Sequence, residues 1–339
     1  MAQVQLLSTM RFTDDLLAQL CGVSPRLHIH QQTCHDADEV GAALAAHPDI
    51  EILYTFHLPH DALEIAPGLR WLQLHSAGVN HILDHPIMER DVAITTVSGI
   101  HATPIAEYVF ASLLAFRWRV PMWTQCQREA RWPSNRWDLY ARPELRDSTL
   151  GILGYGSIGR EVGRLGRAFG MRVLALRRSS GHAKEGFRLE ETGDEAGVVP
   201  ARFFPPDELH EMLSECDFVV IALPLTPETE RFVGEAELRA MKPSAYLVNI
   251  ARGPIVDEQA LIKALDEGWI AGAGLDVFER EPLPDDSPLW AMENALLSPH
   301  VAGFTPRYNE RAAAVFAENL GRYLSGKPLL NLVDKARGY

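Results

Sequence analysis

The sequence lacks the features that would place a protein in a membrane or on a nucleic acid. No stretch of the 339-residue chain reaches the about 18 consecutive apolar residues of a membrane helix. The N-terminus has no basic start followed by a long apolar run, as a secretory signal would. Positive charge is also scarce, because 32 Lys and Arg stand against 45 Asp and Glu, for a formal net charge of −13. We therefore expect neither nucleic acid nor a membrane surface as a partner.

Cysteines are few and scattered. The four of them, Cys21, Cys34, Cys126 and Cys216, include no C-x-x-C pair. Disulfides could form among them, but isolated thiols in a reducing cytoplasm are the interpretation that we favour. Close histidine pairs occur without cysteine or carboxylate ligands in a known metal pattern, so no metal site is predicted.

Between residues 150 and 300, short apolar runs alternate with helical segments. The runs are apolar almost throughout, which is typical of a parallel sheet covered on both faces. A strand–helix–strand order implies right-handed crossovers and a doubly wound sheet. Strands are predicted at 150–153, 173–176, 218–223, 245–250, 270–277 and 295–297, and helices at 158–169, 207–214, 235–241 and 258–267.

The first hundred residues carry a second and shorter α/β pattern. Strands are predicted at 4–7, 27–29, 50–56, 69–74 and 92–95, with helices at 13–20 and 36–46. The fold class is therefore α/β with two doubly wound domains.

Two further helical segments lie outside these patterns. One runs from Thr103 to about Arg131 and contains Pro121, which should kink or break it. The other, residues 309–324, has apolar side chains at helical spacing and is too short to fold alone. We infer that it packs back on the first domain and makes that domain discontinuous. Residues 179–206 show no clear period and are predicted to form a surface loop.

A glycine-rich turn links the predicted strand 150–153 to the helix that follows. Gly154, Gly156 and Gly159 form the pattern G-x-G-x-x-G. Gly154 permits a tight turn, Gly156 lets the backbone approach a pyrophosphate, and Gly159 lets the helix pack closely on the strand. The diphosphate would sit at the helix N-terminus, where free N–H groups and the helix dipole favour an anion. The predicted dinucleotide contacts are Gly154, Tyr155, Gly156, Ser157, Ile158 and Gly159.

The end of the next strand bears on which dinucleotide binds. NAD sites usually carry Asp or Glu there, bonded to the ribose 2′-hydroxyl. This chain has Arg177, Arg178 and Ser179 instead, and Arg177 follows Gly159 by 18 residues. A guanidinium can bind a 2′-phosphate bidentately. The alternative is a solvated basic helix face followed by a surface turn. We predict NADP(H) as the favoured cofactor and NAD(H) as the second choice.

Three charged or titratable residues follow later strands of the same sheet. They are Arg252, Glu281 and His300. Ligands of open α/β sheets bind beyond the carboxyl ends of the strands, so these side chains would meet near the cofactor. Together they form a coherent set for hydride transfer. Taken singly, they could be a surface salt-bridge arginine, a surface glutamate and a loop histidine.

The chain resembles the D-isomer-specific 2-hydroxyacid dehydrogenase family, and in particular its glyoxylate/hydroxypyruvate-reductase-like members. The resemblance covers nearly the whole length and rests on motifs in the family's order at 74–80, 154–159, 223–229, 249–253, 276–282 and 298–303. It implies a Rossmann nucleotide-binding domain, residues 116–303, inserted in a flavodoxin-like substrate domain of residues 1–115 and 304–339. It also implies a homodimer formed through the nucleotide domains.

The resemblance assigns roles to matching residues. His300 would be the general acid/base, Glu281 the carboxylate bonded to it, and Arg252 the group that binds the substrate carboxylate and polarises its carbonyl. Backbone N–H groups in the turn of Ser76, Ala77, Gly78 and Val79 would hold the same carboxylate. Positions near the cofactor are Thr103, Leu223, Pro224, Thr229, Ile250, Ala251, Asp276, His300 and Gly303, with Asp276 towards the nicotinamide amide.

The expected activity is NAD(P)H-dependent reduction of small 2-oxo acids to D-2-hydroxy acids. One alternative is a dinucleotide-sensing, corepressor-like protein without turnover, because a fold alone does not fix a function. The other is NAD-dependent oxidation of D-2-hydroxy acids, phosphoglycerate included. We disfavour a phosphorylated substrate, because residues 71–90 offer only Arg90 as an extra cation.

Four tryptophans accompany arginines between residues 117 and 146, a composition that favours an interface and supports the homodimer.

Overall fold

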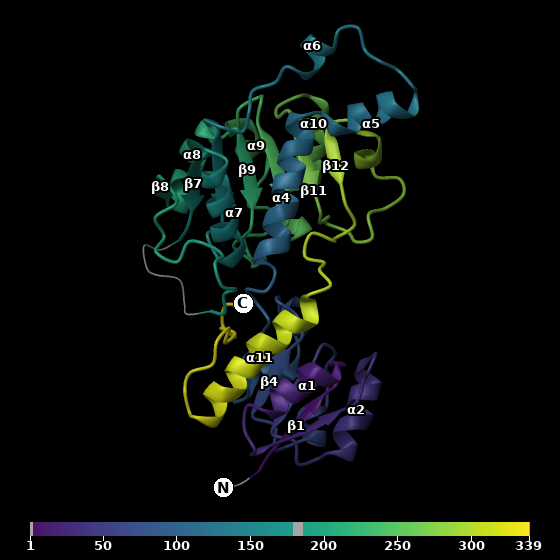
Figure 1. The fold of residues 1–339 in the computed structure, drawn as a ribbon, viewed down its shortest axis with the longest axis vertical. Helices are drawn as coiled ribbons and strands as arrows, with labels where there is room; N and C mark the ends of the chain where they lie inside the picture. The colour runs from purple at the N-terminus through teal and green to yellow at the C-terminus, as the bar shows by residue number, and fades with distance from the viewer. Residues whose placement is uncertain (1–2, 179–185, 339) are drawn as a thin grey trace. The chain divides into compact units, whose positions relative to one another are not determined.

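The computed structural model describes residues 3–178 and 186–338, which form two compact α/β units (Figure 1). The first unit draws on Met1–Ile100, Ala183–Leu189 and Thr305–Tyr339, and the second on His101–His182 and Glu190–Phe304. The sequence analysis put the first boundary at residues 115/116, whereas the compact units divide at 100/101. The difference concerns one helix, whose buried face packs with the second unit.

The first unit is built on a five-stranded parallel sheet of order β2-β1-β3-β4-β5. Its strands are β1 (Val4–Ser8), β2 (Leu27–Gln31), β3 (Ile52–Thr55), β4 (Trp71–Leu74) and β5 (Ala93–Thr95). Its helices are α1 (Asp14–Cys21), α2 (Ala37–Ala46), α3 (Ala62–Ile65) and α11 (Tyr308–Leu324), with 3₁₀ turns η1 (Asn80–Ile82) and η2 (Pro86–Glu89). All five strands were predicted, with ends that differ by one or two residues.

The C-terminal helix α11 completes the core of the first unit. Its apolar stripe of Ala313, Phe316 and Leu320 is fully buried against Tyr54 and Trp71 of the sheet. Helix α11 therefore packs within the first unit. Burial of the stripe explains why so short a helix is stable in this position.

The second unit contains a seven-stranded parallel sheet of order β12-β11-β10-β9-β6-β7-β8. Its strands are β6 (Thr149–Leu153), β7 (Arg172–Leu176), β8 (Arg202–Phe204), β9 (Phe218–Ile221), β10 (Tyr246–Asn249), β11 (Gly272–Leu275) and β12 (Ala295–Leu297). Its helices are α4 (Ala102–Arg117), α5 (Val120–Arg128), α6 (Arg136–Tyr140), α7 (Ser157–Ala168), α8 (Leu209–Glu215), α9 (Glu235–Ala240) and α10 (Glu258–Asp266). The 3₁₀ turns are η3 (Pro206–Glu208), η4 (Gly253–Ile255) and η5 (Pro288–Ala291).

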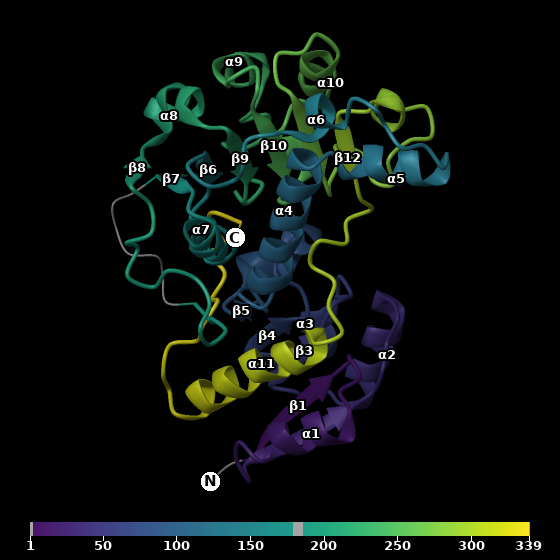
Figure 2. The same ribbon diagram turned by 45° about the horizontal axis from the view of Figure 1, so that its top comes forward.

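Helices cover both faces of this larger sheet. Residues of α8, α9 and α10 form one core with the strands, and residues of α4 and α7 form another. Figure 2 shows the two groups of helices on opposite sides of the strands. The predicted doubly wound α/β fold is confirmed, and the continuous apolar runs are explained by burial on both faces.

Two local features differ in detail from the expectations. The segment predicted as a surface loop ends in the edge strand β8, whose Phe204 is fully buried. The long helical segment does break near Pro121, as predicted. The break comes at Arg119, which has φ +53°, so Pro121 falls in the first turn of α5, where proline is tolerated.

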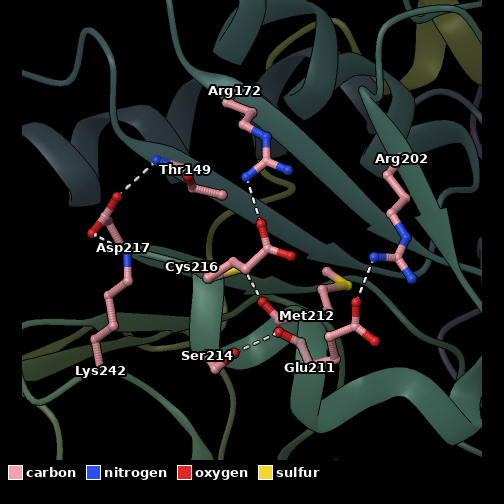
Figure 3. Close-up of polar contacts among 10 residues, drawn as sticks. Thr149, Arg172, Arg202, Glu211, Met212, Ser214, Cys216, Asp217 and Lys242 are labelled. Atoms are coloured by element: carbon pink, nitrogen blue, oxygen red, sulfur yellow. Dashed lines mark hydrogen bonds and ion pairs between the residues drawn. The ribbon is translucent and has the colours of Figure 1, made fainter.

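Ion pairs close the amino-terminal edge of the second unit's sheet (Figure 3). Asp217, just before β9, accepts hydrogen bonds from the Thr149 backbone N–H at 2.8 Å and from the Lys242 ammonium at 2.9 Å. Beside it, Arg172 at the start of β7 pairs with Glu215. These charged side chains pair with one another within the unit, so we assign this edge a role in stability.

All four cysteines are free thiols. Cys216 donates to the Met212 carbonyl at 3.0 Å, and burial raises the pKa of its thiol to about 12, so it stays protonated. Among the described residues, no helix is both long and apolar enough to cross a membrane.

Candidate active site

The glycine turn lies between β6 and α7, as its pattern predicts. Gly154 has φ +100°, and a Cβ there would lie 2.7 Å from the Ala222 carbonyl oxygen. A Cβ on Gly159 would collide with the Gly154 carbonyl, so this glycine permits close helix packing. A Cβ on Gly156 would meet no atom within 4 Å. The turn therefore leaves open space at the helix N-terminus, which fits the diphosphate of a dinucleotide.

Tyr155 anchors this turn from inside. Its hydroxyl donates to the Asp194 carboxylate at 2.8 Å. Burial by itself would raise the pKa of Asp194, but bonds from the Val199 N–H, the Tyr155 hydroxyl and the Val198 N–H lower it overall. The Arg160 guanidinium also binds the Asp194 carbonyl. Neither Asp194 nor Arg160 carried a predicted role.

Arg177 and Arg178 follow β7, the neighbour of β6 in the sheet. The Arg177 guanidinium lies 3.6 Å from the centre of the Phe203 ring, a cation–π contact that fixes its direction. Arg178 is exposed. The Thr226 hydroxyl lowers the pKa of Glu228, and the charge of Arg178 adds to this effect. Two cations thus occupy the strand end, while Ser179 lies outside the described residues.

Residues after β9 and β10 line the same carboxyl edge. The turn after β9 is closed by Thr229, whose hydroxyl donates to the Pro224 carbonyl at 2.6 Å and accepts from the Thr226 N–H at 2.8 Å. Leu223 is half-buried, Ile250 and Ala251 after β10 are buried, and Thr103 lies in the first turn of α4. These cofactor positions therefore come from neighbouring strands and from one helix start.

Arg252 is held at the end of β10 by local contacts. Its guanidinium donates to the Ala251 carbonyl at 2.6 Å, and the Asn249 amide donates to the Arg252 carbonyl at 3.1 Å. The next residue must be glycine, because a Cβ on Gly253 would collide with the Phe278 backbone. Burial lowers the pKa of Arg252, and the negative charge of Glu281 opposes that shift. The side chain remains a cation suited to a carboxylate.

Glu281 and His300 form a direct pair. His300 Nδ1 lies 2.8 Å from Glu281 Oε2, and Glu281 Oε1 accepts from the Phe278 N–H at 3.1 Å. The side chains are 49% and 37% exposed, so the imidazole can meet a ligand. Since Nδ1 faces the carboxylate, Nε2 is the ring nitrogen left to face a ligand. The arrangement is that of a general acid/base oriented by a carboxylate.

Asp276 fixes the loop that carries His300. Its carboxylate accepts from the Ser298 hydroxyl at 2.6 Å and from the N–H groups of Val301 and Ala302 at 2.8 and 2.9 Å. The Tyr108 hydroxyl lies 2.6 Å from the Ser298 oxygen and extends this network to α4. The role of Asp276 towards a nicotinamide amide stays a prediction. Sequence reasoning missed Tyr108, which has no motif around it, and gave Ser298 no role.

Gly303 and the Ser76–Val79 loop complete the predicted set. A Cβ on Gly303 would lie 3.0 Å from the His101 ring, so this position of the second unit is tightly packed. The loop belongs to the first unit and follows β4 after one residue, His75. Its Ser76 hydroxyl donates to the Gly78 carbonyl at 2.9 Å, which keeps the turn compact. The second unit alone therefore brings together the glycine turn, the two arginines after β7 and the three predicted catalytic side chains.

Comparisons with known proteins identify relatives of this chain. Residues 110–302 match the family model of the D-isomer specific 2-hydroxyacid dehydrogenase, NAD binding domain. A glyoxylate reductase of Korarchaeum cryptofilum is 38% identical over 290 residues, which cover 84% of this chain and 81% of that protein. A D-isomer specific 2-hydroxyacid dehydrogenase of Xanthobacter autotrophicus, solved with NADPH and MES, is 30% identical, with a TM-score of 0.79 and 100% of each chain covered. An NADPH-dependent glyoxylate/hydroxypyruvate reductase of Sinorhizobium meliloti, solved with NADP and sulfate, is 26% identical, with a TM-score of 0.77 and 99% and 100% covered.

Proposed function

The chain belongs to the D-isomer specific 2-hydroxyacid dehydrogenase family, and we propose from this premise that it reduces small 2-oxo acids, such as glyoxylate and hydroxypyruvate, to D-2-hydroxy acids. The observation that carries the proposal is the 2.8 Å contact between His300 and Glu281. The pair lies at the sheet edge that also holds Arg252 and the glycine turn. That edge therefore combines an acid, a carboxylate-binding cation and a dinucleotide cradle.

Each protein group has a defined task in this reaction. A bound NAD(P)H supplies the hydride. His300 donates the Nε2 proton to the carbonyl oxygen of the substrate, and Glu281 orients the ring through its bond to Nδ1. Arg252 binds the substrate carboxylate and stabilises the charge that develops on the oxygen. We assign the backbone N–H groups of Ser76–Val79 to the same carboxylate, as the family resemblance implies.

NADPH is the proposed cofactor. Arg177, oriented by Phe203, and Arg178 both follow β7, the strand end at which a dinucleotide's 2′-phosphate would be recognised, and a guanidinium can bind such a phosphate bidentately. The solved relatives from Xanthobacter autotrophicus and Sinorhizobium meliloti were crystallised with NADPH and NADP, which supports this preference. The relatives named glyoxylate reductase favour reduction over the corepressor-like and D-2-hydroxyacid-oxidising alternatives.

The proposal extends to assembly and location. Trp132, after α5, and Trp137, in α6, are 83% and 79% exposed, and Trp132 lines a cavity of about 460 Å³. Exposed aromatic surface of this kind is typical of an interface, and we assign it to a second copy of the chain. Light scattering of the wild type against Trp132→Ser tests the homodimer.

Four free thiols support a cytoplasmic location, which fractionation of native cells tests.

The decisive experiment is a matrix of steady-state rates. Oxidation of NADPH and of NADH is followed with glyoxylate, hydroxypyruvate and longer 2-oxo acids. We expect turnover with the short acids and a higher kcat/KM for NADPH than for NADH. Arg177→Asp and Arg178→Asp serve as variants that should reverse the cofactor preference. Tight binding of a dinucleotide without turnover on any acid would contradict the proposed function.

A further inference from the structure

His75 directly precedes the Ser76–Val79 loop and lies between two tyrosines of the first unit. The Tyr54 hydroxyl, from β3, is 2.6 Å from His75 Nδ1, and the two ring centres are 5.5 Å apart. Tyr308, the first residue of α11, donates its hydroxyl to the His75 carbonyl at 2.8 Å, with the ring centres 4.9 Å apart. Tyr54 is fully buried. We call these three residues the Tyr–His–Tyr clasp.

Both tyrosines are permanent hydrogen-bond donors. Burial raises the pKa of the Tyr308 hydroxyl to about 12 and that of Tyr54 well above its ordinary value. Neither hydroxyl therefore ionises near neutral pH. In the neutral imidazole, the Tyr54 hydroxyl donates to His75 Nδ1 and the ring proton resides on Nε2. The clasp thus holds both the ring and the backbone carbonyl of one residue.

The contact to the carbonyl has a consequence for the loop. The His75 carbonyl and the Ser76 N–H belong to one planar peptide unit and point in opposite directions when the bond is trans. A bond that fixes the direction of the carbonyl therefore fixes the direction of the first N–H of the loop. Neighbouring bonds hold the same stretch, since the His75 N–H donates to the Thr55 carbonyl at 2.8 Å and the Val97 N–H donates to the Ser76 carbonyl at 3.0 Å.

We propose that the Tyr–His–Tyr clasp positions the Ser76 N–H, and with it the Ser76–Val79 loop, to receive the carboxylate of the 2-oxo acid. The inference rests on the proposed function, because that function gives the loop its ligand. Tyr54, His75 and Tyr308 are positioning residues that act through the loop backbone. Through Tyr308, the C-terminal helix sets the affinity for substrate from a position 233 residues along the chain from His75.

Tyr308→Phe tests the proposal by removal of one hydroxyl. We expect the KM for glyoxylate to rise about three- to tenfold, the effect of one lost neutral hydrogen bond, while kcat changes less than about twofold. The KM for NADPH should not change. The matched control is Tyr323→Phe on the same helix, whose hydroxyl donates to the Glu51 carboxylate at 2.5 Å and has no bond to the loop. It should leave all three constants unchanged.

A second pair of variants separates positioning from a general loss of packing. His75→Ala removes the acceptor of the Tyr54 hydroxyl, and His75→Asn keeps an oxygen close to the place of Nδ1. We expect the KM for glyoxylate to rise in His75→Ala and to stay close to the wild-type value in His75→Asn. An unchanged KM for glyoxylate in Tyr308→Phe, with an active wild type, would contradict the positioning role of the clasp but not the proposed function. A wild type without turnover on any 2-oxo acid would overturn the proposed function and the clasp with it.

Discussion

The two edges of the second unit's sheet use charge in opposite ways. At the amino edge, Asp217 is bonded both to Lys242 and to the Thr149 backbone (Figure 3). At the carboxyl edge, His300 and Glu281 bond to each other and keep 49% and 37% of their side-chain surface exposed. Exposure does not separate the two edges, since Arg172 and Glu215 at the amino edge are 48% and 31% exposed; the difference is that the carboxyl edge holds an imidazole, whose Nε2 can exchange a proton with a ligand. Substitutions at the first edge should therefore cost stability, and substitutions at the second should cost turnover.

The largest expected effect is that of His300→Ala. Loss of the general acid should lower kcat by about 100- to 10,000-fold, while the free energy of unfolding changes little because the side chain is half exposed. Rates at saturating glyoxylate and NADPH, together with urea unfolding, measure both quantities. A variant with wild-type kcat would show that another group supplies the proton.

Arg252→Lys should rank second. Lysine keeps the charge but presents it as a point instead of a planar fork, so bidentate binding of the substrate carboxylate is lost. We expect kcat/KM for glyoxylate to fall about 100- to 1000-fold, with a smaller change in the KM for NADPH. The matched control is Arg239→Lys, an exposed arginine of α9 that pairs with Glu235. Equal losses in the two variants would contradict the assigned role.

Asp194→Asn tests the distinction between stability and turnover, because this carboxylate lies near the glycine turn but bonds to other groups of the protein. It accepts from Tyr155, Val198 and Val199, so we expect a loss of about 1–3 kcal/mol of unfolding free energy and little loss of kcat. The folded pKa of Asp194 is lowered, so its contribution is full above about pH 4 and disappears as the pH falls through the folded value. The difference in unfolding free energy from the wild type should therefore narrow on acidification. A constant difference would assign the effect to packing alone.

Local patterns made much of the fold and part of the site predictable. Most strands were predictable because they are buried on both faces and their apolar runs are continuous. The glycine turn was predictable because its three glycines fall within six residues. The strand β8 was missed because it is three residues long and begins with the exposed Arg202. Contacts that join distant segments left no local signal. Tyr155 meets Asp194 across 39 residues, and Tyr108 meets Ser298 across 190.

The smallest expected effect is that of Asp217→Asn at the amino edge. The variant keeps an acceptor for the Thr149 N–H but loses the charge that faces Lys242, and both side chains of this pair are about a third exposed. Solvent screens such a pair, so we expect a loss of about 0.5–1 kcal/mol of unfolding free energy and unchanged kcat and KM. Added salt should reduce the difference from the wild type, because the lost interaction is electrostatic. A measurable fall in kcat would mean that the amino edge is coupled to the catalytic groups across the strands, and the division of labour between the two edges would then be wrong.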